Sequence, residues 1–178
     1  MRYLSSLGVN ASDVDEVLLL NVSLPNLQKL GGRLAEEALD ESPLFQAVGG
    51  QNIWSQLRED PLPSLSRLSN LTYLQFTRAY SGEQLAFLTG WFPKLKILSL
   101  RDLPNLNRLE IQYCTMASLE NLFLTNLSSM TEVPAGIEFL TSIKYLGFHQ
   151  ISRDFLPSLR QCSAIQGIMS RVGCSLRD

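Results

Sequence analysis

The only histidine of this 178-residue sequence, His149, is the first residue to test for catalytic chemistry. Nucleophilic or acid–base catalysis by histidine requires a serine, cysteine or carboxylate held beside the ring. The sequence around His149 offers no such pairing, and Cys114, Cys162 and Cys174 lack the spacing of a metal site. We therefore expect no catalytic residue and no metal site, and we interpret His149 as a surface contact residue.

Two glycine pairs are further candidates for ligand chemistry, because glycine-rich loops can cradle phosphates. They are Gly31-Gly32 and Gly49-Gly50, and neither is followed by the Gly-Lys-Ser/Thr sequence that such loops carry. We interpret both pairs as turns, and we expect no cofactor and no small-molecule ligand. The sequence therefore predicts a protein that is not an enzyme.

Leucines that return at a fixed interval indicate the elements that position all other residues. Runs of the form LxxLxL start at Leu71, Leu95, Leu119 and Ile143, which are 24 residues apart. The alternation within each run is typical of a strand with one buried face. This period is typical of leucine-rich repeats, whose leucines are buried only when the turns stack. The sequence thus predicts an α/β solenoid: a leucine-rich-repeat arc with a parallel β-sheet on the concave face, an irregular or short-helical convex side and a C-terminal helix.

The repeats are expected to fill one domain over residues 1–178. Clear starts lie near residues 4, 27, 71, 95, 119 and 143. The interval from 27 to 71 is about two periods, so we expect a degenerate repeat near 47–57, where no LxxLxL run is present. A helix over 155–168 is predicted to cap the C-terminal end.

The segments that join the predicted strands differ from one another. Residues 81–84 (Ser-Gly-Glu-Gln) form a capping-box pattern and predict a short helix that ends at Gly90. Leu106–Ile111 repeats the alternating pattern and predicts a strand on the returning side. Ile137 and Leu140 have helical spacing. The convex side is therefore expected to be irregular.

The position eight residues after each start is apolar, as in Leu103 and Leu127. Many leucine-rich repeats carry Asn or Cys at this position, where the side chain satisfies backbone groups of the turn. Because this chain does not, we expect its strand-to-turn geometry to be less regular.

Composition limits the other possible roles. The net charge is −2 with both signs scattered, so no basic patch points to nucleic acid. The sequence has neither a run of about 18 apolar residues that would span a membrane nor the apolar core of a signal peptide. The odd number of cysteines favours a reduced, cytoplasmic setting. Sequons at Asn10, Asn21, Asn70 and Asn126 would matter only in a secreted protein.

Outward-facing residues of the predicted strands are the candidate binding surface. Four of them are large, namely Tyr73, Ile97, Phe123 and Tyr145. With strands about 4.8 Å apart, these four would form a stripe roughly 15 Å long. Alternatively, they only pack against one another across strands. The candidate partner-binding residues are Tyr73, Gln75, Lys96, Ile97, Arg101, Glu120, Phe123, Lys144, Tyr145 and His149.

Several runs in the chain carry a family resemblance. Residues 95–111 read Leu-Lys-Ile-Leu-Ser-Leu-Arg-Asp-Leu-Pro-Asn-Leu-Asn-Arg-Leu-Glu-Ile, and residues 116–124 read Met-Ala-Ser-Leu-Glu-Asn-Leu-Phe-Leu. With 24–34 and 133–140, they resemble the leucine-rich-repeat region of plant nucleotide-binding (NB-ARC-LRR, NLR) disease-resistance proteins. The resemblance extends from about residue 4 to residue 168.

This resemblance implies protein recognition in plant defence. Such receptors recognise pathogen effectors or modified host proteins inside the cell, and their repeats hold a neighbouring nucleotide-binding switch inactive. The sequence carries no nucleotide-binding motif, so we expect a C-terminal piece of such a receptor that binds neither ATP nor ADP. The expected partner is an effector, a host protein or another domain of the same receptor. Two alternatives are a signalling scaffold with similar repeats and the substrate-binding arm of a ubiquitin-ligase adaptor.

Overall fold

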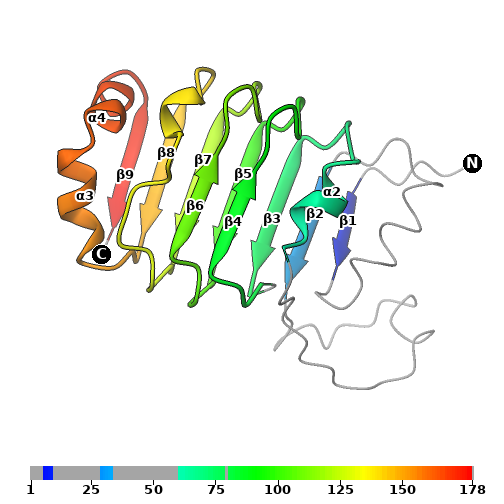
Figure 1. Cartoon of the computed structure of the whole chain (residues 1–178), viewed down its shortest axis with the longest axis horizontal. Helices are drawn as coiled ribbons and strands as arrows, with labels where there is room; N and C mark the ends of the chain where they lie inside the picture. Colours follow the sequence, from blue (N-terminus) through cyan, green and yellow to red (C-terminus); the bar gives the residue numbers. More distant parts are fainter. Residues whose placement is uncertain (1–5, 10–28, 34–59, 79, 178) are drawn as a thin grey trace, which may run out of the picture.

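A row of parallel strands forms the main layer of the protein (Figure 1). The computed structural model describes residues 6–9, 29–33, 60–78 and 80–177. Seven strands form one sheet in the order β1-β2-β3-β5-β7-β8-β9, and every neighbouring pair is parallel. The predicted α/β class is thus confirmed. The strands are Ser6–Val9 (β1), Lys29–Arg33 (β2), Tyr73–Thr77 (β3), Ile97–Arg101 (β5), Asn121–Thr125 (β7), Tyr145–His149 (β8) and Gly173–Arg177 (β9).

The strand pairing places the recurring apolar residues opposite one another. From β3 through β8, paired residues are 24 positions apart, as in Leu74 opposite Leu98. The four strands predicted from the runs that start at 71, 95, 119 and 143 are therefore confirmed. Side chains of these paired rows are buried, which gives the sheet one core-facing side. The two core rows are Leu74, Leu98, Leu122 and Leu146, and Phe76, Leu100, Leu124 and Phe148.

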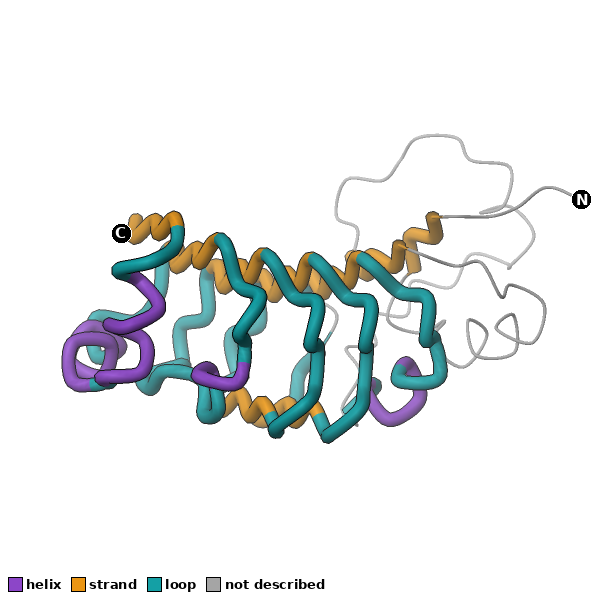
Figure 2. Tube along the Cα trace, turned by 90° about the horizontal axis from the view of Figure 1, so that it is seen from above, coloured by secondary structure: helices purple, strands orange, loops and turns teal. Residues whose placement is uncertain are grey.

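A smaller layer closes the other side of the core (Figure 2). In it, β4 (Gln84–Phe87) and β6 (Arg108–Ile111) pair in parallel. Two short helical turns, α2 (Leu62–Leu65) and η2 (Ile137–Phe139), lie on the same side. The strand predicted over Leu106–Ile111 is confirmed, and the apolar side chains of both layers fill the space between them.

The helix predicted after residues 81–84 is wrong, because this segment forms strand β4. Leu85 and Phe87 are buried while Gln84 is exposed, which is the alternation of a strand. The carbonyl of Glu83 accepts the N–H groups of Asn107 and Arg108 in the next connection, at 2.9 and 3.1 Å. A helix would need that carbonyl for its own first turn. Contacts between successive connections therefore override the local capping pattern.

The strand-to-turn geometry is regular, contrary to the prediction drawn from the apolar position. Arg78, Asp102, Asn126 and Gln150 each follow a strand, and their φ angles are 54°, 53°, 52° and 51°. The first three donate their N–H groups to the carbonyl that ends the next strand, at 3.1, 3.0 and 2.9 Å. Because the neighbouring strand satisfies these donors, no polar side chain is needed at the following position.

The C-terminal segment contains two helices and one further strand. The single helix predicted over 155–168 is interrupted at Cys162, whose backbone is extended between α3 (Phe155–Gln161) and α4 (Ser163–Met169). The chain then enters β9, which the sequence analysis missed, and Leu146 stands opposite Cys174. The helices therefore connect β8 to β9 and do not close the array (Figure 1).

The N-terminal predictions are only partly covered by the described residues. Gly31 and Gly32 lie within β2, so the turn predicted at this pair is wrong. β2 pairs directly with β3, with Leu30 opposite Leu74, across a step of 44 residues. The degenerate repeat expected near 47–57 lies outside the described residues, as does the Gly49-Gly50 pair. Within the described part of the chain, no helix is long and apolar enough to cross a membrane.

Candidate functional site

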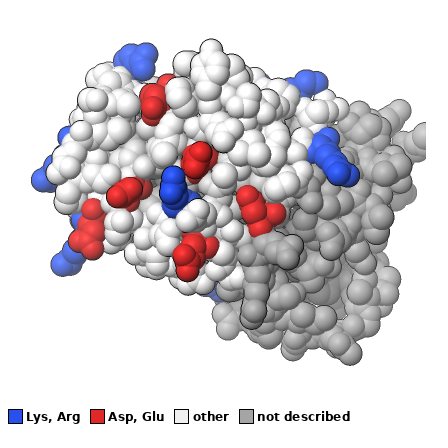
Figure 3. Space-filling model, viewed as in Figure 1, with Lys and Arg blue, Asp and Glu red and all other residues white. Residues whose placement is uncertain are grey.

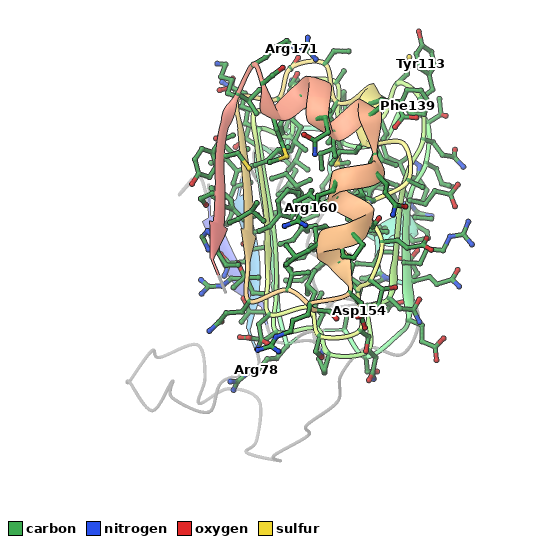
Figure 4. The ribbon with its side chains drawn as sticks, turned by 90° about the vertical axis from the view of Figure 1, so that its left-hand side faces the viewer. Arg78, Tyr113, Phe139, Asp154, Arg160 and Arg171 are labelled. Carbon is green, nitrogen blue, oxygen red and sulfur yellow. The ribbon has the colours of Figure 1, made fainter. Side chains whose placement is uncertain are left out.

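The outward side of the seven-stranded sheet carries the predicted binding residues. Figure 4 looks along the array from its C-terminal end, with the core between the two layers. We call the outward-facing residues of β3, β5, β7, β8 and β9 the sheet face. Strand pairing arranges them in rows across the strands. The rows are Tyr73, Ile97, Asn121, Tyr145 and Gly173; Gln75, Ser99, Phe123, Gly147 and Ser175; and Thr77, Arg101, Thr125 and His149.

The four large residues do not form the single stripe that the sequence predicted. Tyr73, Ile97 and Tyr145 share the first row, but Asn121 stands between Ile97 and Tyr145. Phe123 lies in the second row, because it is two residues further along β7 on the same side. The large side chains therefore form two groups, one at β3 and β5 and one at β7 and β8.

The second group is a packed aromatic pair. The ring centroids of Phe123 and Tyr145 are 5.5 Å apart at an interplanar angle of 42°. Each ring lies over a glycine of the next strand: a Cβ atom on Gly147 would lie 2.8 Å from Phe123, and one on Gly173 would lie 2.9 Å from Tyr145. Cross-strand packing thus fixes both rings. Both remain partly exposed, so a partner can still contact them.

The first group is held by hydrogen bonds along β3. The Tyr73 hydroxyl donates to Gln75 Oε1, and Gln75 Nε2 donates to Thr77 Oγ1 at 2.9 Å. Ser99 on the neighbouring strand is buried, so the face is low at its centre. Side chains that are already ordered lose less conformational entropy when a partner binds. This geometry suits a preformed contact surface.

Three charged residues border the sheet face where the strands begin. Lys96, Glu120 and Lys144 each precede a strand. The Glu120 carboxylate lies 2.9 Å from Lys144 Nζ and 4.0 Å from Lys96 Nζ. The hydrogen bond from Lys144 is the main cause that holds the pKa of Glu120 below its usual value. Exposed ion pairs of this kind contribute little to stability, so these groups are available to a charged partner.

The third row carries Arg101 and the single histidine. Arg101 is exposed, and His149 Nε2 lies 2.6 Å from Ser175 Oγ, with which it shares a hydrogen bond. The sequence analysis missed this pairing because it did not predict β9. Among the described residues, no carboxylate contacts the ring to orient it for general-base chemistry. The pair therefore joins β8 to β9 on the sheet face.

The cysteines and acidic residues can be examined for metal binding in the described part of the chain. There, no three His, Cys, Asp or Glu side chains are placed to hold one ion. Cys114, Cys162 and Cys174 are free thiols, and burial raises the pKa of the Cys174 thiol. The described charge and aromatic features therefore concentrate the candidate function on the sheet face.

Comparison with known proteins adds a second kind of observation. No protein-family model matches the chain. It is 32% identical over 106 residues to "Disease resistance protein RPM1" of Arabidopsis thaliana, which is 60% of this chain and 11% of that protein. It is 26% identical over 108 residues to "Disease resistance RPP8-like protein 3" of the same plant, covering 60% of this chain and 12% of the relative. The chain spans only about a tenth of the length of these relatives, and over 60% of its own length it is consistent with a fragment of a plant disease resistance protein.

Proposed function

We propose that the chain is a leucine-rich-repeat arc that serves as a protein-recognition module in plant immunity. The 24-residue step between paired strands supports the repeat architecture, which we extend to one domain over residues 1–178. The names of the relatives support the role in defence. The partner in this proposal is a pathogen effector, a host protein or another domain of the same receptor, met in the cytoplasm.

The observation that carries this proposal is the arrangement of the sheet face. Aromatic and arginine side chains are the most frequent energetic anchors of protein interfaces. The Phe123–Tyr145 pair, Tyr73 and Arg101 present such groups from rigid strands. In this proposal the chain acts by binding alone, with neither a catalytic residue nor a cofactor, and binds no nucleic acid or small molecule.

A screen followed by matched variants tests the proposal. The full chain is tested in a two-hybrid screen against pathogen effectors and host proteins of the plant, and each hit is titrated against the purified chain by calorimetry. Combining Tyr73→Ser, Phe123→Ser and Tyr145→Ser should weaken a sheet-face partner about tenfold or more. The control is Tyr113→Ser, which removes an exposed tyrosine from the opposite side of the molecule.

Two readings decide the outcome. Loss of binding in the triple variant, with binding kept in the control and an unchanged folded spectrum, supports the sheet face. A confirmed partner whose affinity is unaffected by the triple variant would overturn the assignment of this surface. Partners that require Tyr113 belong to a different surface, which is described next.

A further inference from the structure

An exposed apolar edge lies on the side of the molecule opposite the sheet face. Its members are Leu88, Tyr113 and Phe139, whose residues are 37%, 67% and 39% exposed. Among the described residues, the one other large hydrophobic residue with comparable exposure is Leu176 in β9, at 46%. Figure 4 places Tyr113 and Phe139 at the same corner, pointing away from the core. We call these three residues the apolar edge.

Successive turns of the smaller layer bring these residues to one place. Leu88 directly follows β4, Tyr113 follows β6 by two residues, and Phe139 ends η2. The rings of Tyr113 and Phe139 meet edge to face, with centroids 5.6 Å apart and an interplanar angle of 83°. An isolated exposed aromatic is ordinary, but a paired one with an apolar neighbour is a typical contact site.

The backbone beneath the apolar edge is fixed. The Gly90 N–H donates to the Cys114 carbonyl at 3.2 Å, and the Thr89 N–H donates to Gln112 Oε1 at 3.2 Å. Gly136 has a φ of 79°, and a Cβ atom there would lie 1.9 Å from the Ile111 carbonyl oxygen. Glycine is therefore required where the η2 turn closes against β6. The aromatic pair is held in place before any partner arrives.

Acidic residues surround the apolar edge. Over residues 82–90, 106–118 and 130–142 the charged residues are four acids against one base, Arg108, which lies 3.6 Å from Glu110 in an ion pair. Figure 3 shows Asp and Glu spread over this side of the molecule. This charge would repel nucleic acid and anionic lipid, and it favours a cationic partner. The four acids are Glu83, Glu110, Glu132 and Glu138.

We propose that the apolar edge is a second docking surface, for a positively charged protein segment. An apolar side chain of that segment packs on the Tyr113–Phe139 pair, and its lysine or arginine side chains face the surrounding carboxylates. An arginine can also stack on the exposed ring of Tyr113, which carries electron density on its faces. This surface is separate from the sheet face, so it stands whether or not a sheet-face partner is found.

Fluorescence anisotropy with the full chain tests this surface. The probe is a labelled synthetic peptide of alternating arginine and leucine, compared with one in which leucine is replaced by serine and one in which arginine is replaced by glutamate. The arginine–leucine peptide should bind about tenfold or more tightly than either comparison peptide. The variants Tyr113→Ser with Phe139→Ser, and separately Glu138→Lys, should each weaken its binding, and all these positions are exposed.

The matched control removes aromatic residues from the other side. Tyr73→Ser with Tyr145→Ser should leave the affinity for the arginine–leucine peptide unchanged, and thermal unfolding verifies that every variant is folded. Equal affinity of wild type and the Tyr113/Phe139 variant would overturn the proposal. So would loss of binding in the sheet-face variant alone, or no binding by the arginine–leucine peptide. Self-association that depends on Tyr113, seen by sedimentation, would mean that a second copy occupies the edge and would also overturn it.

Discussion

Leu98 lies fully buried in the middle of the large sheet, opposite Leu74 on one side and Leu122 on the other. Leu98→Ala should lower the free energy of unfolding by about 2–5 kcal/mol, because the neighbouring strands cannot collapse into the cavity. Urea unfolding followed by circular dichroism measures this loss. Arg101→Ala, at an exposed position of the same strand, should cost less than about 0.5 kcal/mol. A negligible loss for Leu98→Ala would contradict its place in the core.

Gly147 makes the room in which the Phe123 ring lies. A Cβ atom at Gly147 would be 2.8 Å from that ring, so Gly147→Ala should push Phe123 away from Tyr145 and cost about 1–3 kcal/mol. Thermal unfolding and the aromatic chemical shifts in NMR report both effects. Gly167→Ala is the matched control, because its Cβ atom meets open space within α4. That change should stabilise the chain by about 0.5–1 kcal/mol, and equal effects at both glycines would rule out the packing argument.

The outward direction of the candidate residues could be predicted, but their contacts could not. Alternation with buried leucines is enough to place Tyr73 and Ile97 on the sheet face. The contact of Phe123 with Tyr145 depends on a glycine in the next strand, which no local pattern identifies. The bond from His149 to Ser175 depends on a strand that begins 28 residues after β8 begins, outside the 24-residue interval.

Left-handed residues at the strand ends are the recurrent element that the interval itself hides. Gln150 has a φ of 51°, a conformation that costs a side chain other than Gly, Asn or Asp about 1–2 kcal/mol. Gln150→Gly should therefore raise the free energy of unfolding by about 0.5–1 kcal/mol in chemical denaturation. Asn126→Gly should give no such gain, because Asn tolerates this conformation and Asn126 Nδ2 donates to Asp102 at 2.7 Å. Equal gains at both positions would argue against relief of backbone strain.

The carboxyl of Asp60 begins α2 and accepts the N–H of Leu62 at 2.9 Å. Burial raises its pKa above the usual 3.8, although hydrogen bonds from Leu62 and Ala86 oppose the shift. The folded chain therefore binds this proton more tightly than the unfolded chain. Its contribution to stability is fully present below pH 3.8 and is lost as the pH rises through the folded value.

Asp60→Asn should remove this pH dependence. Between about pH 3 and pH 6, wild type should lose stability relative to Asp60→Asn as the pH rises, as measured by urea unfolding at each pH. Glu120→Gln is the control with the opposite sign, because the pKa of Glu120 is lowered and its contribution is lost as the pH falls. If both comparisons change with pH in the same direction, the burial of Asp60 is not the cause.

The strands of the large sheet were predictable because each repeats the same apolar alternation. β4 was not, because Ser81-Gly-Glu-Gln favours a helix start by itself and becomes a strand only beside β6. β9 was not, because Arg171 occupies the position held by Leu or Ile in earlier runs. Where the neighbouring connection decides the outcome, the local sequence is a poor guide.

The whole molecule has two sides of different charge. Lys96, Arg101 and Lys144 outnumber Glu120 on and beside the sheet face, while acids outnumber bases around the apolar edge. The two surfaces are separated by the core between the layers (Figure 2). Substitutions on one side should therefore have independent effects on binding to the other. A chain of this kind can hold two partners of unlike charge at once.

The constant step between paired residues sets how the chain can change its length. Removing residues 95–118 would bring Leu74 opposite Leu122 and leave every remaining side chain on its own side of the sheet. Removing one residue from a strand would instead turn its leucines to solvent. The chain shortened by 24 residues should still melt in one cooperative transition by circular dichroism, whereas deletion of Ser99 alone should abolish it. Insertions and deletions in such a gene are then tolerated in whole units, which lets the binding surface lengthen or shorten without a new fold.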